Sequence, residues 1–290
     1  MLWKMNRPEI LIVGINNFLG IAIFNLLKDN FNVIGVYNHN TDIAPQCIEL
    51  IQVERLNTLK ERKFSHIYLI SSYVPGLGKP NDDQKLIDAN ILLPRRVIDL
   101  FPESRIIFCS SVSIYENRIK KGLILNSEPP SPKSKYAISK LWGEETVKES
   151  KSYAIIRISS MYGVGMNKNT FLPKVIEKAV LSGEIILLGE GERMQNYIHV
   201  VDVANIAVKA ALHPINTELM AVSNSSYSNK EIAQMIIELI PETSLNFSGS
   251  DSSKSFVYDN SFTCQELGQM EFKNIKEGLK ELKEWIKKEY

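Results

Sequence analysis

The chain has 290 residues, of which 44% are hydrophobic and 23% are charged. That balance is typical of a globular protein with enough apolar material for a core, and it excludes general disorder. Thirty-four lysines and arginines against 33 aspartates and glutamates leave a formal net charge of +1. No overall field therefore attracts the protein to nucleic acid or to a membrane surface, and we expect no nucleic-acid partner.

The three cysteines, Cys47, Cys109 and Cys264, form no CxxC pair and leave one thiol over in any disulfide scheme. This usage is typical of a reducing compartment and disfavours a thiolate zinc cluster. The first nine residues have no apolar secretory core, and no apolar run approaches the ~20 residues that a membrane span needs. We therefore expect a cytoplasmic protein without a metal site or a membrane partner.

Short β-branched runs recur along the first half of the chain, separated by stretches long enough for crossover helices. Such near-continuous apolar runs indicate strands buried on both faces, and their alternation with helices predicts a parallel sheet. The predicted strands are residues 9–13, 32–36, 48–53, 66–70, 105–109 and 153–158. We therefore predict an α/β fold with a Rossmann-type doubly wound parallel sheet and a smaller mixed α/β C-terminal substrate domain.

After residue 160 the pattern changes to helices with short, isolated strands. Gly183 is expected to end the first of these helices, Asp202 to cap the second, and a capping-box spacing precedes the third. The predicted helices are residues 171–181, 203–212, 232–240 and 274–288. We place the dinucleotide-binding domain at residues 1–162, with about 196–213 returning to it, and the substrate-binding domain at residues 163–290.

The first predicted strand runs into a glycine-containing turn, Gly14-Ile-Asn-Asn-Phe-Leu-Gly20, where a helix is predicted to begin. A glycine there lets the backbone turn tightly while helix N–H groups face an anion, as in dinucleotide-binding folds. Asn17 stands where a third glycine is usual, and Asn is the other residue that best tolerates left-handed backbone angles. Two glycines at this spacing also occur in ordinary strand-to-helix turns. The candidate cofactor-binding residues of the turn are Gly14, Asn17, Phe18, Leu19 and Gly20.

The end of the second strand, at Tyr37 and Asn38, carries no carboxylate. A fold that binds NAD usually has an acidic residue there, which accepts a hydrogen bond from the ribose 2′-hydroxyl. His39 stands where it could approach a 2′-phosphate, while a single loop histidine is more often simply solvated. The cofactor is therefore NAD or NADP, with a mild preference for NADP, and Tyr37 and Asn38 are candidate cofactor contacts.

Tyr136 and Lys140 are four residues apart in a predicted helix, so they lie on one face, one turn apart. A phenol that titrates near ~10 is a poor base at neutral pH, and a neighbouring ammonium lowers its pKa by favouring phenolate. Such a tyrosine can exchange a proton with a hydroxyl during hydride transfer. The same spacing arises by chance on many helices, so it does not identify a site on its own.

Ser111 follows the fifth predicted strand, at the edge of an open α/β sheet where ligands bind. Its hydroxyl can hold the reacting oxygen by a hydrogen bond. Ser110 and Ser113 compete for this role, and we expect those two to satisfy backbone groups at the strand end instead. The candidate catalytic residues are therefore Ser111, Tyr136 and Lys140.

With these motifs the chain resembles the extended short-chain dehydrogenase/reductases, the NAD(P)-dependent epimerase/dehydratase group that acts on nucleotide sugars. The resemblance covers nearly the whole sequence, and several ordered motifs at suitable separations are more specific than any one of them. Its marks are Gly14 to Gly20, Asn90, Ser111 with Tyr115, Tyr136 with Lys140, residues 157–163, 189–191 and 197–202, and the C-terminal pattern over 267–285.

The resemblance implies a role for each matching residue. It makes Tyr136 the acid/base, has Lys140 bind the nicotinamide ribose and lower the tyrosine pKa, and has Ser111 fix the substrate oxygen. Ser71 and Ser72 follow the fourth strand, where the family lines the cofactor with small residues. The resemblance also implies a nucleotide-sugar substrate and a homodimer formed through helices that flank the sheet.

The helix after the fourth strand contains two further residues of interest. Asn90 is a supporting polar residue near the cofactor in the family pattern, and it could equally be an asparagine that satisfies local backbone groups. Pro94 lies inside the predicted helix and is expected to kink it.

The chain departs from the family pattern at the expected substrate contacts. Ser160 stands where many epimerases have an Asn that contacts substrate phosphate. Gln195 stands where an Arg often grips the diphosphate, and Arg193, two residues earlier, can substitute for it. The candidate substrate-binding residues are Ser111, Ser160, Arg193 and Gln195.

The resemblance leaves two hydride chemistries open. A 4,6-dehydratase of this family needs an acid pair directly after the hydroxyl residue of strand five, where this chain has Val112 and Ser113, so dehydration is disfavoured. We expect a 4-epimerase or a 4-keto-sugar reductase, in a pathway such as polysaccharide biosynthesis. The alternative is a dinucleotide-binding sensor or structural protein of the same fold that catalyses nothing.

Overall fold

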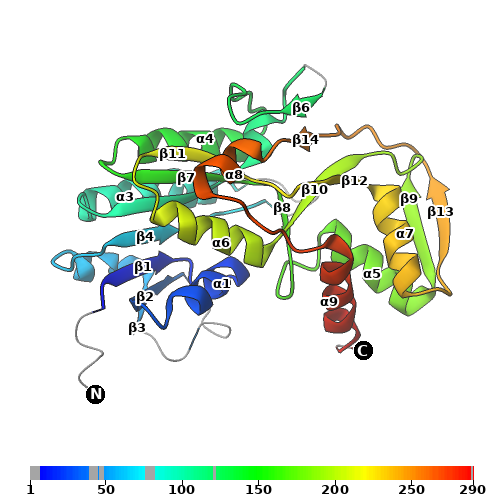
Figure 1. Cartoon of the computed structure of the whole chain (residues 1–290), viewed down its shortest axis with the longest axis horizontal. Helices are drawn as coiled ribbons and strands as arrows, with labels where there is room; N and C mark the ends of the chain where they lie inside the picture. Colours follow the sequence, from blue (N-terminus) through cyan, green and yellow to red (C-terminus); the bar gives the residue numbers. More distant parts are fainter. Residues whose placement is uncertain (1–6, 39–44, 46–48, 76–81, 120–121, 289) are drawn as a thin grey trace.

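A seven-stranded, wholly parallel sheet forms the larger part of the molecule (Figure 1). The computed structural model describes residues 7–38, 45, 49–75, 82–119, 122–288 and 290, so His39 and Cys47 lie outside the described residues. The strands in spatial order are β11 (Thr217–Ala221), β7 (Tyr153–Ile158), β5 (Arg105–Ser111), β4 (His66–Leu69), β1 (Glu9–Val13), β2 (Asn32–Tyr37) and β3 (Glu49–Gln52). The predicted doubly wound sheet is confirmed, and all six predicted strands belong to it.

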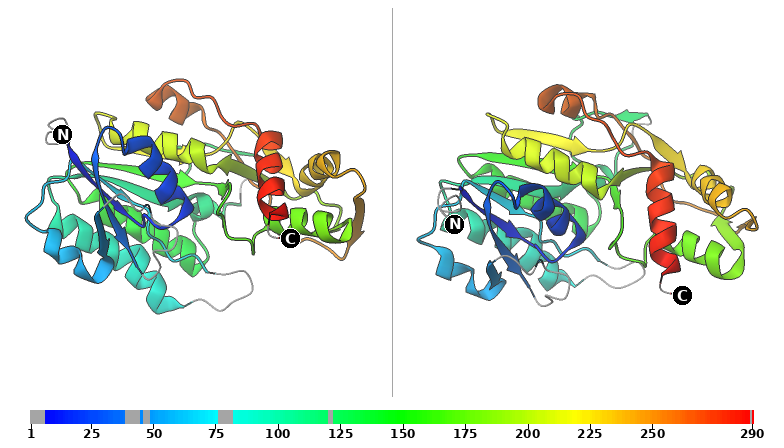
Figure 2. Two further views of the ribbon diagram at one scale, coloured as in Figure 1. Left: turned by 90° about the horizontal axis from the view of Figure 1, so that it is seen from below. Right: turned by 60° about the horizontal axis from the view of Figure 1, so that its bottom comes forward.

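Helices cover both faces of this sheet, which is why most residues of its strands are apolar. Alternate residues of β1 point to opposite faces, because side chains alternate along a strand. Ile10 and Ile12 pack with α1 (Phe18–Leu27) and α6 (Val200–Ala211). Leu11 and Val13 belong to the core on the other face, which includes side chains of α3 and α4. Figure 2 shows α1 and α6 side by side along one face.

The helical connection after β4 is interrupted. It consists of α2 (Asp83–Ile87), the π-helical segment η3 (Asp88–Leu92) and α3 (Leu93–Leu100), with Pro94 in the first turn of α3. The interruption expected at Pro94 thus lies in the π-helical segment just before it. Pro94 itself lies in the first turn of α3, where its missing N–H costs no hydrogen bond of that helix. Asn90 lies in the π-helical segment and is completely buried.

The C-terminal part is smaller and mixed, and it lies to the right in Figure 1. It contains a three-stranded sheet, β12-β10-β8, and a two-stranded one, β13-β9. Its strands are β8 (Ser160–Tyr162), β9 (Glu184–Leu188), β10 (Met194–His199), β12 (Ser226–Ser228) and β13 (Ser244–Ser248), and its helices are α5 (Phe171–Ser182), α7 (Asn229–Leu239) and α9 (Ile275–Lys287). The predicted smaller mixed unit is confirmed as an architecture, whereas the boundary at residue 162 remains a prediction.

The remaining elements are two short strands and several helices. The short strands β6 (Leu123–Ile124) and β14 (Val257–Tyr258) pair in parallel, which brings the C-terminal segment beside the loop after β5. The other elements are α4 (Lys135–Lys148), α8 (Ser261–Leu267) and the 3₁₀ helices η2 (Val53–Leu59) and η4 (Val112–Tyr115).

The helices agree with the sequence-based predictions at three points and differ at one. Gly183 ends α5 with a left-handed backbone, the capping box of Ser228 and Glu231 is formed, and α9 is amphipathic. The N-cap predicted at Asp202 is wrong, because α6 begins at Val200 and His199 is its cap. Asp202 is instead buried in the first turn and accepts a hydrogen bond from the backbone N of Lys273 at 3.0 Å.

Within the described ranges, no helix combines the length and apolar character needed to cross a bilayer. The same residues contain no group of three or more histidine, cysteine or acidic side chains that could hold a metal ion.

Candidate active site

The turn between β1 and α1 leaves no room for side chains at its two glycines. A Cβ on Gly20 would lie 2.5 Å from the carbonyl oxygen of Gly14, so α1 packs directly on the turn. A Cβ on Gly14, whose φ is +100°, would lie 2.8 Å from the backbone N of Ser71 at the end of β4. The turn therefore presents bare backbone and the α1 N-terminus at the carboxyl ends of the neighbouring strands β1 and β4. This cradle fits the pyrophosphate of a dinucleotide.

The backbone of Asn17 has a different conformation from the one expected. Its backbone is extended, with φ −104° and ψ 163°, so the predicted need for left-handed angles is wrong. Its side chain caps α1 by accepting a hydrogen bond from the backbone N of Gly20 at 2.8 Å. An ordinary N-cap residue occupies this position because the turn is closed by Gly14 alone.

The other candidate cofactor residues lie along the same carboxyl edge of the sheet. Phe18 and Leu19 begin α1; Leu19 is buried, and Phe18 contacts both the main core and the core of the C-terminal part. Tyr37 is half-buried at the end of β2, and Asn38 is exposed after it. Ser71 and Ser72 follow β4 and are half-buried. The cofactor-binding roles of these residues remain predictions, but the fold gathers them at one edge.

Tyr136 lies at the same edge, in the first turn of α4, and its phenol interacts with the hydroxyls of Ser111 and Ser72. Burial raises the pKa of this phenol above its ordinary value, and the two serines act in the opposite direction. The sequence-based expectation that Lys140 lowers the pKa is therefore not met in the protein alone. The structure does bring the predicted serine and tyrosine together.

Lys140 is completely buried one turn further along α4. Its Nζ donates a hydrogen bond to the carbonyl oxygen of Cys109 at 2.6 Å and lies 4.4 Å from the ring centroid of Phe108. Burial lowers the pKa of this ammonium to about 8, against smaller raising effects from Cys109 and Glu144. Lys140 thus carries its charge at neutral pH although its buried surroundings disfavour the charged form.

The end of β5 carries Ser110 and Ser111, Ser113 follows in η4, and the hydrogen bonds of these hydroxyls differ from the expectation. Ser111 accepts a hydrogen bond from the backbone N of Ser113 at 3.1 Å and so caps η4. Ser110 donates to Glu144 Oε1 at 2.5 Å, and Ser113 Oγ is buried without a partner. The prediction that Ser110 and Ser113 satisfy backbone groups is therefore wrong, because the strand ends at Ser111 and its hydroxyl is the one that reaches the following turn.

A buried ion cluster lies beneath this edge, and the sequence reasoning did not identify it. Arg157 of β7 contacts Glu144 of α4, Glu218 of β11 and the hydroxyl of Tyr115. Burial opposes the charge of Arg157, but hydrogen bonding to Glu144 raises the pKa of the guanidinium overall. The signal that could have revealed the cluster is the spacing of Glu144, which lies one turn after Lys140 on the same helix face.

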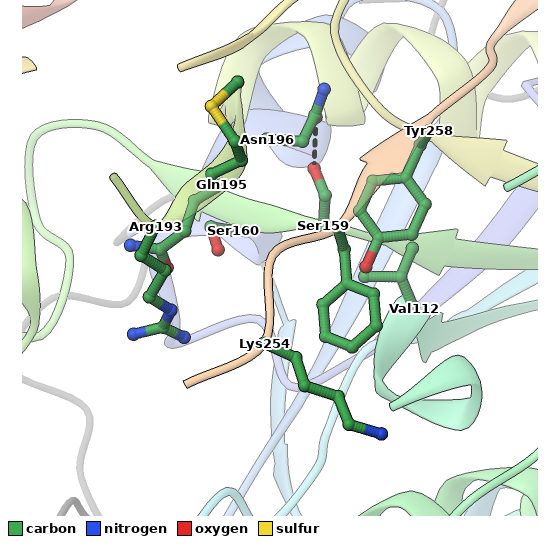
Figure 3. A pocket seen from close by; sticks show the side chains of 10 residues that line it. Val112, Ser159, Ser160, Arg193, Gln195, Asn196, Lys254 and Tyr258 are labelled. Carbon is green, nitrogen blue, oxygen red and sulfur yellow. Dashed lines mark hydrogen bonds between the residues drawn. The ribbon is translucent and has the colours of Figure 1, made fainter. Parts of the chain in front are cut away.

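Three of the four predicted substrate residues line one pocket, which Figure 3 shows. Ser160 is exposed at the start of β8, and Arg193 lines the pocket with its Nε left without a hydrogen-bond partner. Gln195 is engaged elsewhere, since it donates to the Tyr197 hydroxyl at 2.9 Å and to Asn229 Oδ1 at 3.1 Å. The remaining lining residues are Val112, Ser159, Met194, Asn196, Lys254, Phe256 and Tyr258.

The pocket adjoins the catalytic candidates, because Val112 follows Ser111 directly. Sequence reasoning missed Lys254, Phe256 and Tyr258, which come from the C-terminal segment. They reach the pocket through the pairing of β14 with β6 and through a hydrogen bond from Lys254 Nζ to the carbonyl oxygen of Glu116 at 3.3 Å. Nothing in the local sequence of that segment marks it as part of a site.

A parallel sheet with a glycine turn at its first βα unit, and serine, tyrosine and lysine at its carboxyl edge, defines an extended short-chain dehydrogenase/reductase. The chain belongs to the NAD dependent epimerase/dehydratase family, whose model matches residues 10–222. Members of this family act on nucleotide sugars, and the family assignment made from the sequence is confirmed.

Two named relatives are similar to the chain along most of its length. It is 25% identical over 243 residues to a GDP-6-deoxy-D-talose 4-dehydrogenase of Aggregatibacter actinomycetemcomitans, with 80% of each protein covered. It is 23% identical over 306 residues to a proposed UDP-glucose 4-epimerase of Methanocaldococcus jannaschii, with 96% of this chain and 98% of the relative covered.

Solved structures share the fold at lower identity. The UDP-glucuronic acid 4-epimerase of Bacillus cereus, in complex with UDP-glucuronic acid and NAD, superposes with a TM-score of 0.85 at 19% identity, covering 97% of this chain and 100% of that one. MoeE5, in complex with UDP-glucuronic acid and NAD, superposes with a TM-score of 0.82 at 21% identity and the same coverage. The mild preference for NADP gains no support from these comparisons.

Proposed function

We propose that the protein transfers a hydride at C4 of a nucleotide sugar, as a 4-epimerase or a 4-keto-sugar reductase. The observation that carries the proposal is the placement of Tyr136 at the start of α4 beside Ser111 at the end of β5, next to both the glycine cradle and the adjoining pocket. A tyrosine held against a second hydroxyl is arranged to exchange a proton with a sugar oxygen. The relatives named for 4-dehydrogenase and 4-epimerase activity support chemistry at that carbon.

Five of the candidate residues have a defined task in this proposal. A bound nicotinamide dinucleotide supplies the hydride acceptor or donor. Gly14 and Gly20 keep the turn open for the pyrophosphate, and Ser111, whose oxygen already accepts from the backbone, can donate its proton to the sugar oxygen. Tyr136 exchanges a proton with that same oxygen. Lys140 holds a positive charge one helical turn away and would bind a ribose hydroxyl of the bound cofactor.

Dehydration is disfavoured because the site lacks the additional acid. Positions 112 and 113 are valine and serine, and no carboxylate is among the residues that line the described pocket. The nearest buried carboxylate, Glu144, is occupied by Arg157 and Ser110. It is therefore not available as a proton acceptor for elimination.

In this proposal Arg193 and Ser160 bind the phosphates of the substrate. Arg193 has an unpaired Nε at the pocket, and Lys254 is the second cation that lines it. Gln195 is bonded within the protein, so we now propose it as a support for the pocket wall rather than as a direct contact.

The test has two measurements. Denatured protein is first analysed for the nucleotide that it releases, and nucleotide sugars and their 4-keto forms are then supplied with NAD, NADH, NADP and NADPH. Retained NAD with interconversion of 4-epimers supports an epimerase, and consumption of reduced cofactor by a 4-keto sugar supports a reductase. Dinucleotide binding without turnover of any sugar would overturn the proposal in favour of a non-catalytic binding protein.

A further inference from the structure

The side chain of Asn90 hydrogen-bonds to two serines that lie next to Tyr136, Ser139 and Ser72. Its side chain is completely buried in the π-helical segment. On one side, Asn90 Nδ2 donates to Ser139 Oγ at 2.9 Å, and Ser139 Oγ donates to the carbonyl oxygen of Tyr136 at 2.8 Å. On the other side, Asn90 Oδ1 accepts from Ser72 Oγ at 2.9 Å. The asparagine therefore fixes the backbone of the tyrosine and a serine next to its phenol.

Ser72 is the link between Asn90 and the phenol. Its hydroxyl interacts with the hydroxyl of Tyr136, as does that of Ser111. A serine has one proton to donate and two lone pairs. While Ser72 donates to Asn90, its oxygen can only accept, so it suits a protonated Tyr136 that donates to it. A phenolate needs the opposite arrangement, in which the serine donates.

The surroundings allow that reversal at small cost. Asn90 Oδ1 also accepts from the backbone N of Tyr73 at 3.0 Å, so it keeps a donor when Ser72 turns away. Asn90 Nδ2 additionally donates to the carbonyl oxygen of Tyr73 at 3.2 Å, which holds the amide in place throughout. No buried polar group would be left unpaired by the rotation, and leaving one unpaired is the main penalty in such a site.

We propose that Ser72 is a positioning residue for the acid/base Tyr136, with a hydroxyl that donates to Asn90 while the phenol is protonated and rotates to donate to the phenolate oxygen when the proton is gone. Ser72 keeps its own proton, and the proton that leaves Tyr136 goes to the sugar oxygen. The expectation that Ser72 only lines the cofactor is thereby extended. The inference rests on the proposed function in taking Tyr136 as the group that changes its protonation state.

The test measures the titration of one phenol. The chain has 11 tyrosines, so a difluorotyrosine is incorporated at position 136 alone and followed by fluorine NMR against pH. The fluorines withdraw electrons and bring the titration into a range in which the protein stays folded. Four chains are compared: the wild-type background, Ser72→Ala, Ser72→Thr, and the neighbouring control Ser71→Ala.

We expect Ser72→Ala to move the titration midpoint upward by about one pH unit, since one hydrogen bond to the charged form is lost. Ser71→Ala is expected to leave the midpoint in place, and Ser72→Thr, which keeps a hydroxyl, to restore it to within a few tenths of a unit. Equal midpoints for Ser72→Ala and the wild-type background would overturn the proposal, as would a Ser72→Thr midpoint as high as that of Ser72→Ala. The titration needs no sugar, so its failure is distinct from a failure to find turnover.

Discussion

Glu144 of α4 and Arg157 of β7 form an ion pair that is closed to solvent, with 2.8 Å between Glu144 Oε2 and Arg157 Nη2. Their side chains are 0% and 3% exposed. The pair joins the helix that carries Tyr136 and Lys140 to the sheet beneath it. The pair therefore fixes the position of α4 relative to the carboxyl edge of the sheet, where the candidate cofactor residues lie.

We expect Glu144→Ala to destabilise the protein by about 3–5 kcal/mol, because it leaves the Arg157 guanidinium buried without its main partner. Urea unfolding measures this loss. The matched control is Glu145→Ala on the exposed side of the same helix, where a surface ion pair with Lys148 contributes at most about 1 kcal/mol. Equal stabilities for the two variants would contradict the structural role of the buried pair.

Asn17 offers a test that separates helix capping from cofactor binding. Asn17→Asp keeps a good N-cap, so the free energy of unfolding should stay within about 0.5 kcal/mol of wild type. The added negative charge faces the pyrophosphate position, so NAD affinity should fall at least about tenfold. Asn17→Ser is the control that should retain both properties. If Asn17→Asp binds NAD as tightly as wild type, measured by calorimetry, the dinucleotide does not lie at this turn.

The first strands were predictable from the sequence for a physical reason. Strands buried on both faces are continuous apolar runs, and residues 9–13 and 153–158 agree with β1 and β7 at every residue. β11 was missed because its sequence, Thr-Glu-Leu-Met-Ala, includes a glutamate. That glutamate, Glu218, is acceptable in a sheet strand because Arg157 and Lys148 pair with it.

The site was only partly predictable, because several of its properties depend on contacts between distant segments. Spacing placed Tyr136 and Lys140 on one face, and the strand end indicated Ser111. The direction in which the pKa of Tyr136 shifts depends on burial. The hydrogen bond between Ser72 and Asn90 depends on how the segment after β4 packs against the π-helical segment. Neither leaves a pattern in the local sequence.

Lys140 should make stability depend on pH in alkaline solution. Its pKa is about 8 in the folded protein and 10.5 ordinarily, so between these values the unfolded chain binds the proton more fully. The folded state therefore gains stability as the pH rises through this window. We expect the wild-type free energy of unfolding, minus that of Lys140→Met, to rise by about 1 kcal/mol per unit between pH 8 and pH 10.

Denaturant unfolding at several pH values measures this difference. Lys148→Met on the same helix is the control, because the pKa of Lys148 is raised rather than lowered. The contribution of Lys148 to stability is lost only as the pH rises beyond the ordinary lysine pKa. The stability difference between wild type and Lys148→Met should therefore not rise between pH 8 and pH 10. A flat difference for Lys140→Met would show that the ammonium is not penalised in the folded protein.

The exposed face of α4 provides a test of the predicted homodimer. Trp142 and Ile138 lie one turn apart on this helix and are 59% and 46% exposed. We expect light scattering to give twice the chain mass for wild type, and Trp142→Glu to give a monomer, because a buried unpaired carboxylate opposes association. Leu212→Glu, at a similarly exposed apolar position after α6, should remain dimeric. A monomeric wild type at micromolar concentration would contradict the prediction.

The most direct measurement of the central claim compares wild type with Tyr136→Phe for NAD binding and for turnover of the sugar that wild type converts. Tyr153→Phe, at the opposite end of the sheet, controls for loss of a tyrosine hydroxyl. We expect Tyr136→Phe to bind NAD within about twofold of wild type and to turn over about 10²–10⁴ times more slowly, the usual contribution of a general acid or base. Turnover by Tyr136→Phe at the wild-type rate would contradict the account.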